Sequence, residues 1–388
     1  MNFNWSVRET VRPLASRLFS SVYTPAHPYS FHIGASFAPK PPIRFAGEKP
    51  RVPFPSDGII GSWRNKMLSR RKAVQTKACG EDFFFYVNVD AQHVGSYDIR
   101  VLSCLGGLRV VFGQGVCLGV ADGITAWLES GVDPALFSQA LMFHAHRYAR
   151  SAWAGEPEVD PTLDYEEREQ VEGWELTPYE CMDLAYGGVL REKAVEAGSS
   201  TACILTLNSA NGLLRAANLG DSGFSIIRGG SILYSQPVQT HFFNCPKQLT
   251  KLPPPSGKRF TRACVDSPRD AETYQTQLCN GDIIVAYTDG LTDNVFPHEM
   301  AEICSPDPEV DPSDDAQVQS MADRLIIHAR DCMAAKTRVS PFERHAAREG
   351  MFFPGGKPDE LSFSTLTDAR LRFHSVTVVV ALVRETEG

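Results

Sequence analysis

Two aspartates occur in the same local setting, each directly after an apolar run and directly before a glycine. Asp122 follows the run 116–121, and Asp289 follows the run 283–288. A carboxylate at the end of a buried strand is costly unless another group pairs with it, and a following glycine lets the backbone turn sharply. One Asp-Gly step is most often only a turn. Because the step occurs twice in the same context, both aspartates are candidates for one shared site.

Two further acidic pairs, Glu81-Asp82 and Asp359-Glu360, widen this set. If all these carboxylates converge they repel one another, and divalent cations would relieve that repulsion. Ligand sets made of oxygen alone favour Mg²⁺ or Mn²⁺ over Zn²⁺. Two such ions about 3.5–4 Å apart can share a water, lower its pKa and hold the oxygens of a phosphoryl group. The acidic residues therefore predict a two-metal site for phosphoryl chemistry.

Six motifs follow one another over roughly residues 70–385. They are Gly80-Glu81-Asp82, Val120-Ala121-Asp122-Gly123, Gly198-Ser199-Ser200-Thr201-Ala202, Ala217-Asn218-Leu219-Gly220-Asp221-Ser222-Gly223, Thr288-Asp289-Gly290-Leu291-Thr292-Asp293-Asn294 and Gly355-Gly356-Lys357-Pro358-Asp359. In this order they resemble the metal-dependent, type 2C family of serine/threonine protein phosphatases, and specifically its mitochondrial branch. The resemblance implies an α+β fold, an αββα sandwich of two antiparallel sheets flanked by helices. It also implies hydrolysis of phosphoserine and phosphothreonine in proteins by a metal-activated water, with no covalent intermediate.

The resemblance assigns these acidic residues to Mg²⁺ or Mn²⁺, two ions and a weaker third. Residues expected to serve the metal pair are Asp82, Asp122, the carbonyl of Gly123, Asp289 and Asp359, with support from Glu81. Asp221 and Asp293 fall where the family uses them, with Asp289, for the third ion. For Asp221 a simple hairpin turn is an equally good interpretation.

The sequence departs from the family pattern at two catalytic positions. Lys77 stands where the family often has an arginine that holds the substrate phosphate, and lysine offers a point charge without a bidentate clamp. Ile124 stands where many members have a histidine that is a candidate proton donor, so the general acid stays open; a metal-bound water is one candidate. We expect the catalytic set to be Asp82, Asp122, Asp289 and Lys77.

Two segments, 91–114 and 360–375, have no counterpart in the family pattern. We hypothesise that one or both are retained introns or gene-model errors, and a transcript that lacks them would support this. If 360–375 is real, Asp359 lies on a loop and metal affinity falls. A catalytically weakened relative that binds phosphoproteins is therefore the alternative function, and another two-metal hydrolase is a second one.

Two other patterns suggest chemistry that we set aside. Cys332 and Arg338 have the C-x5-R spacing of cysteine-dependent phosphatases, but no glycine lies between them and the segment has a helical pattern. His144 and His146 could suggest a metal site, but residues two apart on a helix point in different directions.

Short strands and separate helices must position the acidic residues. Asn211-Gly212 and Gly220-Asp221 predict tight turns between strands, and Asp133-Pro134 predicts a helix start. The strands expected are 83–89, 116–120, 201–207, 213–218, 223–227, 232–234, 283–288 and 376–383, and the helices expected are 134–148, 178–197 and 315–334. Consecutive strands joined by tight turns are antiparallel, which fits an α+β fold.

Composition and charge limit the partners. The 388 residues are 43% hydrophobic and 22% charged, with a net charge of -8, so the chain can bury a full core and is not expected to bind nucleic acid. The most apolar stretch, 101–121, carries Arg109 and five glycines, so membrane insertion is not expected. The ten cysteines form no C-x-x-C pair, which fits a reducing compartment. We expect a monomer that acts on phosphoprotein substrates.

The N-terminal segment differs from the rest. Residues 1–37 contain Arg8, Arg12 and Arg17 with only one acidic residue, which is typical of a mitochondrial transit peptide; a disordered tail is the alternative. A Pro-rich linker is expected over 38–69, and the phosphatase domain over 70–388. The predicted location is the mitochondrial matrix.

Overall fold

The computed structural model describes residues 28–39, 53–69, 80–89, 115–152, 176–253, 264–357 and 374–386. Several expected features lie outside these residues. They are Lys77, Asp359, the segment 91–114, the segment 360–373 and the leader up to residue 27.

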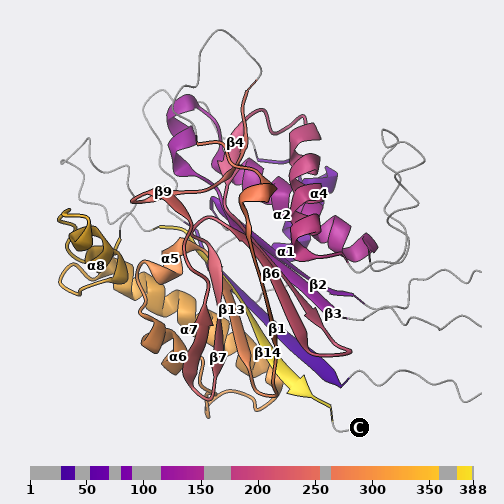
Figure 1. The fold of residues 1–388 in the computed structure, drawn as a ribbon, viewed down its shortest axis with the longest axis vertical. Helices are drawn as coiled ribbons and strands as arrows, with labels where there is room; N and C mark the ends of the chain where they lie inside the picture. Colours follow the sequence, from indigo (N-terminus) through magenta and orange to yellow (C-terminus); the bar gives the residue numbers. More distant parts are fainter. Residues whose placement is uncertain are drawn as a thin grey trace, which may run out of the picture.

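Two five-stranded antiparallel sheets form the centre of the molecule (Figure 1). The first sheet has the order β1 (Tyr29–Ala38), β14 (Val376–Glu385), β13 (Ile283–Tyr287), β7 (Gly223–Arg228) and β8 (Ser231–Ser235). The second has the order β12 (Glu272–Gln277), β6 (Leu213–Leu219), β5 (Ala202–Asn208), β3 (Gly115–Asp122) and β2 (Asp82–Val89). Strands β13 and β14 of the first sheet contact β3 of the second, so the sheets pack face to face.

Helices cover the outer face of each sheet (Figure 1). The second sheet carries α2 (Pro134–Ala152) and α4 (Pro178–Arg191), with α1 (Ile59–Ser69) against α2. The first sheet carries α7 (Asp314–Ala334), with α5 (Asp289–Thr292) and α6 (Pro297–Ile303) beside it. The remaining elements are η3 (Thr125–Ser130), β4 (Gly198–Ser200), β9 (Thr240–Phe242), β10 (Cys245–Pro246), β11 (Leu249–Lys251), η4 (Pro268–Asp270) and α8 (Pro341–Arg348). This is the expected αββα sandwich.

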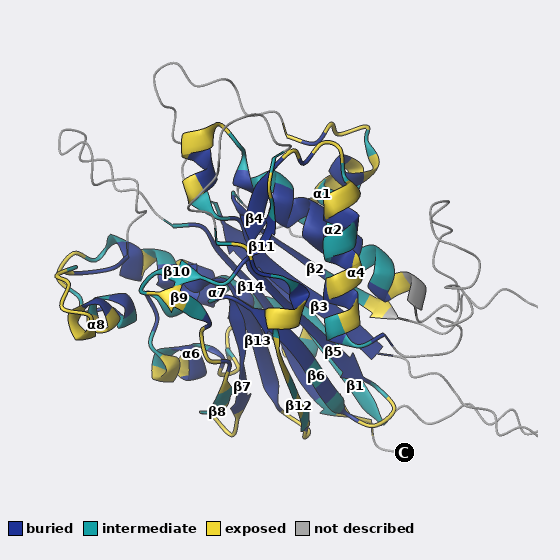
Figure 2. Cartoon of the chain, turned by 45° about the horizontal axis from the view of Figure 1, so that its top comes forward, coloured by how far each residue is buried: buried dark blue, intermediate teal, exposed yellow. Residues whose placement is uncertain are grey.

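The valine run of β14 shows how both faces of a sheet are buried. Val379 and Ala381 join the core cluster between the sheets, while Val378 and Val380 join the cluster under α7. Successive side chains of a strand point to opposite faces, so a strand buried on both faces needs a continuous apolar run. Figure 2 shows the inner strands in dark blue, while the edge strands β8 and β12 are partly exposed.

One predicted turn has a different role in the structure. Asn211-Gly212 joins β5 to β6, which pair as predicted. Gly220-Asp221, by contrast, joins β6 in one sheet to β7 in the other. A hairpin was therefore the wrong interpretation of this step, because the chain crosses between the sheets there.

The predicted domain boundaries also need correction. Strand β1, which the sequence analysis assigned to the leader 1–37, pairs with β14 along its whole length, and Phe37 is buried. Helix α1, assigned to the linker 38–69, buries Ile60 and Met67 in the core between the sheet and α2. The folded domain thus includes Tyr29–Ala38 and Ile59–Ser69. Phe37, Ile60 and Met67 belong to its core.

None of the helices within the described residues is both long and apolar enough to cross a membrane.

Candidate metal centre

The expected acidic residues meet where strands of the two sheets end. Asp82 is the first residue of β2 and lies directly opposite Asp122, the last residue of β3. Asp289 follows β13 of the other sheet and begins α5. Asp82, Asp122 and Asp289 are all buried. The antiparallel order places these strand ends at one edge of the sandwich, as the repeated Asp-Gly pattern predicted.

Asp82 is held by two hydroxyl groups from the opposite sheet. Thr288 Oγ1 donates a hydrogen bond of 2.7 Å to its Oδ2, and Ser375 Oγ donates one of 2.7 Å to its Oδ1. Thr288 in turn accepts a hydrogen bond from the backbone N–H of Thr377. These contacts fix the orientation of Asp82 and join the sheets at the site.

Asp122 is held through its backbone. Its N–H donates to Thr201 Oγ1 at 3.1 Å, and its carbonyl oxygen accepts from Ser200 Oγ at 2.7 Å. Gly123 donates its N–H to the carbonyl of Glu81 at 3.2 Å. The Gly-Ser-Ser-Thr-Ala motif therefore serves to position the end of β3. The Glu81 carboxylate is buried and accepts a hydrogen bond from Thr125.

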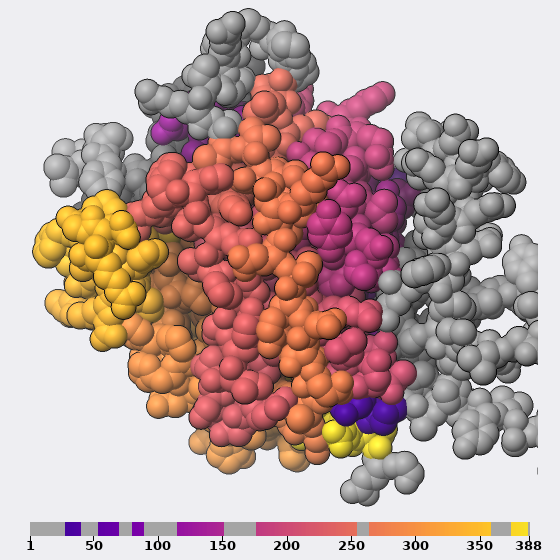
Figure 3. Space-filling model, in the orientation of Figure 1, coloured from indigo at the N-terminus to yellow at the C-terminus, as the bar shows by residue number. Residues whose placement is uncertain are grey.

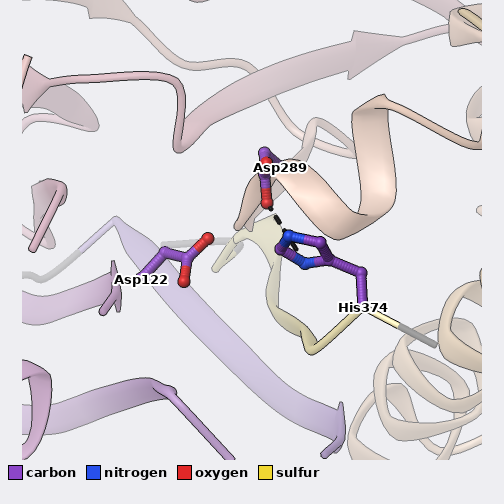
Figure 4. Close-up of side chains that lie close together, drawn as sticks. All are labelled: Asp122, Asp289 and His374. Carbon is purple, nitrogen blue, oxygen red and sulfur yellow. Dashed lines mark ion pairs between the residues drawn. The ribbon is translucent and has the colours of Figure 1, made fainter. Parts of the chain in front are cut away.

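Asp289 faces a lysine and a histidine side chain. Lys357 Nζ lies 2.9 Å from Asp289 Oδ2, and His374 Nδ1 lies 3.6 Å from Asp289 Oδ1. Figure 4 shows His374 next to Asp289, with the carboxylate of Asp122 facing both. Ligand atoms of Asp122, Asp289 and His374 all lie within 4.8 Å of one another.

Asp221 and Asp293 complete the acidic cluster on the side of Lys357. Asp293 Oδ2 lies 2.7 Å from Lys357 Nζ. Burial and the charge of Asp289 raise the pKa of Asp221 to about 8, while Lys357 opposes this. Burial likewise raises the pKa of Asp293, again against the effect of Lys357. Asp221 thus lies close enough to Asp289 and Lys357 for their charges to change its pKa.

The electrostatics of the centre fit a cation. Burial, together with the charges of Asp82 and Asp289, raises the pKa of Asp122 well above its ordinary value. Burial also raises the pKa of Asp82, although the hydrogen bond from Ser375 opposes it. For Asp289 burial acts in the same sense, but His374 and Lys357 outweigh it and lower the pKa. Three buried carboxylates can remain charged together only if positive charge compensates them, and their oxygen atoms suit Mg²⁺ or Mn²⁺.

Four residues of the centre were not predicted from the sequence: Thr288, Lys357, His374 and Ser375. Thr288 and Lys357 lie inside motifs that carried the resemblance, but no role was assigned to them. His374 and Ser375 directly precede β14. They were treated as the end of the segment 360–375, so their position next to the closing strand was the signal that could have identified them.

The C-x5-R pattern is structural. Cys332 is buried on α7, and burial raises the pKa of its thiol to about 11. The guanidinium group of Arg338 contacts its sulfur and forms an ion pair with Glu299. A thiol with a raised pKa is a poor nucleophile, so this pair offers no second catalytic centre.

Known proteins resemble this chain in sequence and in fold. No protein-family model matches the chain. The protein phosphatase PTC7 homolog fig of Drosophila willistoni is 34% identical over 253 residues, which is 65% of this chain and 73% of the relative. The protein phosphatase PTC7 homolog of Homo sapiens is 33% identical over 245 residues, 63% of this chain and 72% of the relative.

Among solved structures, the photosystem II phosphatase PBCP has a TM-score of 0.54 and 23% identity, and covers 92% of this chain and 99% of its own. At this identity the likeness shows the fold alone, and it is the αββα sandwich. The sequence relatives establish the family itself. The chain therefore belongs to the type 2C protein phosphatases, in their PTC7 branch.

Proposed function

We propose that this protein serine/threonine phosphatase hydrolyses its phosphoprotein substrates with two divalent cations, Mg²⁺ or Mn²⁺, held by Asp82, Asp122 and Asp289. One observation supports this above all: three buried carboxylates, contributed by both sheets, converge at one edge of the sandwich. His374 lies within reach of the same ions, and Glu81, Gly123 and Asp359 remain proposed contributors.

Cations bound there would lower the pKa of a water molecule and neutralise the charge of the phosphoryl oxygens. Other residues of the chain orient the carboxylates that would bind these cations. Thr288 and Ser375 hold both oxygens of Asp82, and Thr201 fixes the backbone of Asp122. Such contacts keep the catalytic side chains in the geometry that the reaction requires.

The test is hydrolysis of p-nitrophenyl phosphate and of a phosphothreonine peptide, with Mn²⁺ and with Mn²⁺ plus chelator. We expect activity only without the chelator. Asp289→Asn should keep the fold and lower kcat/KM by on the order of 100-fold or more. Asp311→Asn, at a carboxylate far from the cluster in sequence and fully exposed, is the matched control.

Full activity of Asp289→Asn would contradict the proposed site. A folded wild-type protein with no metal-dependent activity would instead favour the phosphoprotein-binding alternative.

We further propose that the protein acts in the mitochondrial matrix. The arginine-rich, acid-poor residues 1–27 support this. A fluorescent protein fused behind residues 1–28 should enter mitochondria, and a diffuse distribution would contradict the proposal.

A further inference from the structure

The ammonium group of Lys357 lies inside the acidic cluster. Its Nζ lies 2.9 Å from Asp289 Oδ2, 2.7 Å from Asp293 Oδ2 and 2.9 Å from Asn244 Oδ1. An ammonium group carries three protons, and here each has a protein oxygen as its acceptor. The side chain is buried, and its Nζ lies 4.8 Å from the centre of the Phe342 ring.

The two oxygen atoms of Asp289 divide the cluster into two halves. Oδ1 faces His374, on the side where Asp122 lies, and Oδ2 faces Lys357. The first half is the proposed place of the metal pair. The second half contains Asp293 and is close to Asp221, and a cation already fills it.

Neighbouring elements hold Lys357 in this position. Its backbone N–H donates to Asn294 Oδ1 at 2.9 Å. Asn244, in the turn between β9 and β10, has a φ of 57°, a conformation that asparagine tolerates better than most residues. The adjacent Phe243 packs on Phe342 of α8, with ring centres 5.4 Å apart. In Figures 1 and 3 the α8 segment lies at one side of the molecule, beside the β9 hairpin.

We propose that Lys357 is a positioning residue whose ammonium group takes the place of a third metal ion between Asp289 and Asp293. This inference rests on the proposed metal pair. A divalent ion bound to the same oxygens would lie at close range to the ammonium charge, and the repulsion would exclude it. The chain therefore binds two ions and not three, and the expected third-metal role of Asp221 and Asp293 is replaced by an internal ion pair.

Substrate binding is the other role that a lysine at this site could have. Burial argues against it, because a clamp for phosphate must reach the substrate. The hydrogen bonds of the ammonium group also argue against substrate binding, because all three N–H groups donate to oxygen atoms of the protein.

The experiment counts bound Mn²⁺ by equilibrium dialysis and elemental analysis, with isothermal titration as a second readout. Lys357→Met removes the charge while keeping most of the side-chain volume, and it should bind one ion more than the wild type. Lys251→Met is the matched control, since Lys251 Nζ donates to the carbonyl oxygens of Val189 and Glu192, outside the acidic cluster. This control should bind the same number of ions as the wild type.

An equal count for Lys357→Met and the wild type would overturn the inference. If that variant fails to fold, Lys357→Gln replaces it, with the same expected gain of one ion. The wild-type titration is a second test: a third ion bound by the wild type at millimolar Mn²⁺ overturns the inference, and its absence supports it. The absolute wild-type count separately tests the proposed function, because a wild type that binds no ion contradicts the metal pair whatever the variant adds.

Discussion

At the scale of single residues, the glycines after Asp122 and Asp289 are needed because a neighbouring backbone segment leaves no room for a Cβ atom. The Asp-Gly pattern predicts a sharp turn, but neither Gly123 nor Gly290 adopts a positive φ. A Cβ at Gly123 would lie 2.6 Å from the carbonyl oxygen of Pro134, and a Cβ at Gly290 would lie 2.1 Å from that of Ser375. Both glycines allow another backbone segment to approach the aspartate that precedes them.

Gly123→Ala should therefore disturb the centre. The added methyl group meets backbone atoms that cannot rotate away, so we expect a loss of about 1–3 kcal/mol in the free energy of unfolding. Displacement of Asp122 should lower kcat/KM about tenfold or more. Denaturant unfolding and steady-state kinetics check the two effects.

Gly187→Ala is the control for this substitution. Its Cβ would meet only the flexible end of Arg191, at 3.4 Å, and it lies within α4. Alanine there should keep activity and raise stability by up to ~1 kcal/mol. Equal losses in both variants would contradict the spatial explanation.

The residue types and spacing were enough to identify the carboxylates, because aspartate before glycine at a strand end leaves a clear pattern. The residues that complete the centre leave no such pattern. Ser375 and Thr288 are ordinary strand-end residues, and only the packing of the two sheets brings them to Asp82. Lys357 stands 68 residues from Asp289, and its buried contact depends on the path of the intervening chain.

At the scale of elements, α2 and α4 pack closely around one buried histidine. His144 of α2 is 8% exposed, and a Cβ at Gly188 of α4 would lie 2.5 Å from its ring. Neither ring nitrogen has a hydrogen-bond partner among the described residues. Burial, with smaller effects from Arg147 and Arg191, lowers the pKa of His144 to about 4. The contact therefore requires a neutral imidazole.

This contact predicts a pH dependence of stability. The pKa of His144 falls from 6.5 in the unfolded chain to about 4 in the fold, so the unfolded state binds the proton more tightly. The contribution of neutral His144 to the free energy of unfolding is complete above pH 6.5 and is lost as the pH falls from 6.5 towards 4. Between pH 7 and pH 5 we expect a loss of about 2 kcal/mol from this group.

Denaturant unfolding of the wild type and of His144→Gln at both pH values isolates the effect. The wild type should lose about 2 kcal/mol more than the variant between pH 7 and pH 5. Parallel losses would contradict the account, because they would show that the pKa of His144 is the same in the folded and the unfolded chain.

The three longest helices, α2, α4 and α7, and most strands could be predicted because their signals are local, whereas α1, α5, α6 and α8 were not predicted. Helix α4 begins at Pro178, as predicted, with a capping box between Thr177 and Glu180. The partner of a strand is not a local property. The step Gly220-Asp221 has the composition of a hairpin turn, yet it joins different sheets, since the core between the sheets decides where β7 packs.

At the scale of the whole molecule, the two ends of the chain meet in one strand pair. Strand β1 pairs with β14 from Tyr29 opposite Glu385 to Ala38 opposite Val376. The amide of Gln319 on α7 also bonds to both backbone groups of Ala35. The sequence did not reveal this pairing, because its partners lie at opposite ends of the chain.

Deletions at the N-terminus test this arrangement. Removal of residues 1–27 should leave the melting temperature and the activity unchanged. Removal of residues 1–39 should abolish folding, because it strips β14 of one of its two neighbouring strands and removes Phe37 from the core, whose burial alone contributes about 2 kcal/mol. A folded, active protein without residues 1–39 would show that β1 is dispensable.

The proposed activity depends on the convergence of carboxylates from both sheets around cations. The most direct measurement is an anomalous difference map from a crystal grown with Mn²⁺. We expect two peaks about 3.5–4 Å apart between Asp82, Asp122 and Asp289, and none between Asp289 and Asp293. A map with no peak beside these three aspartates, from crystals in which they are well ordered, would contradict the proposed metal centre.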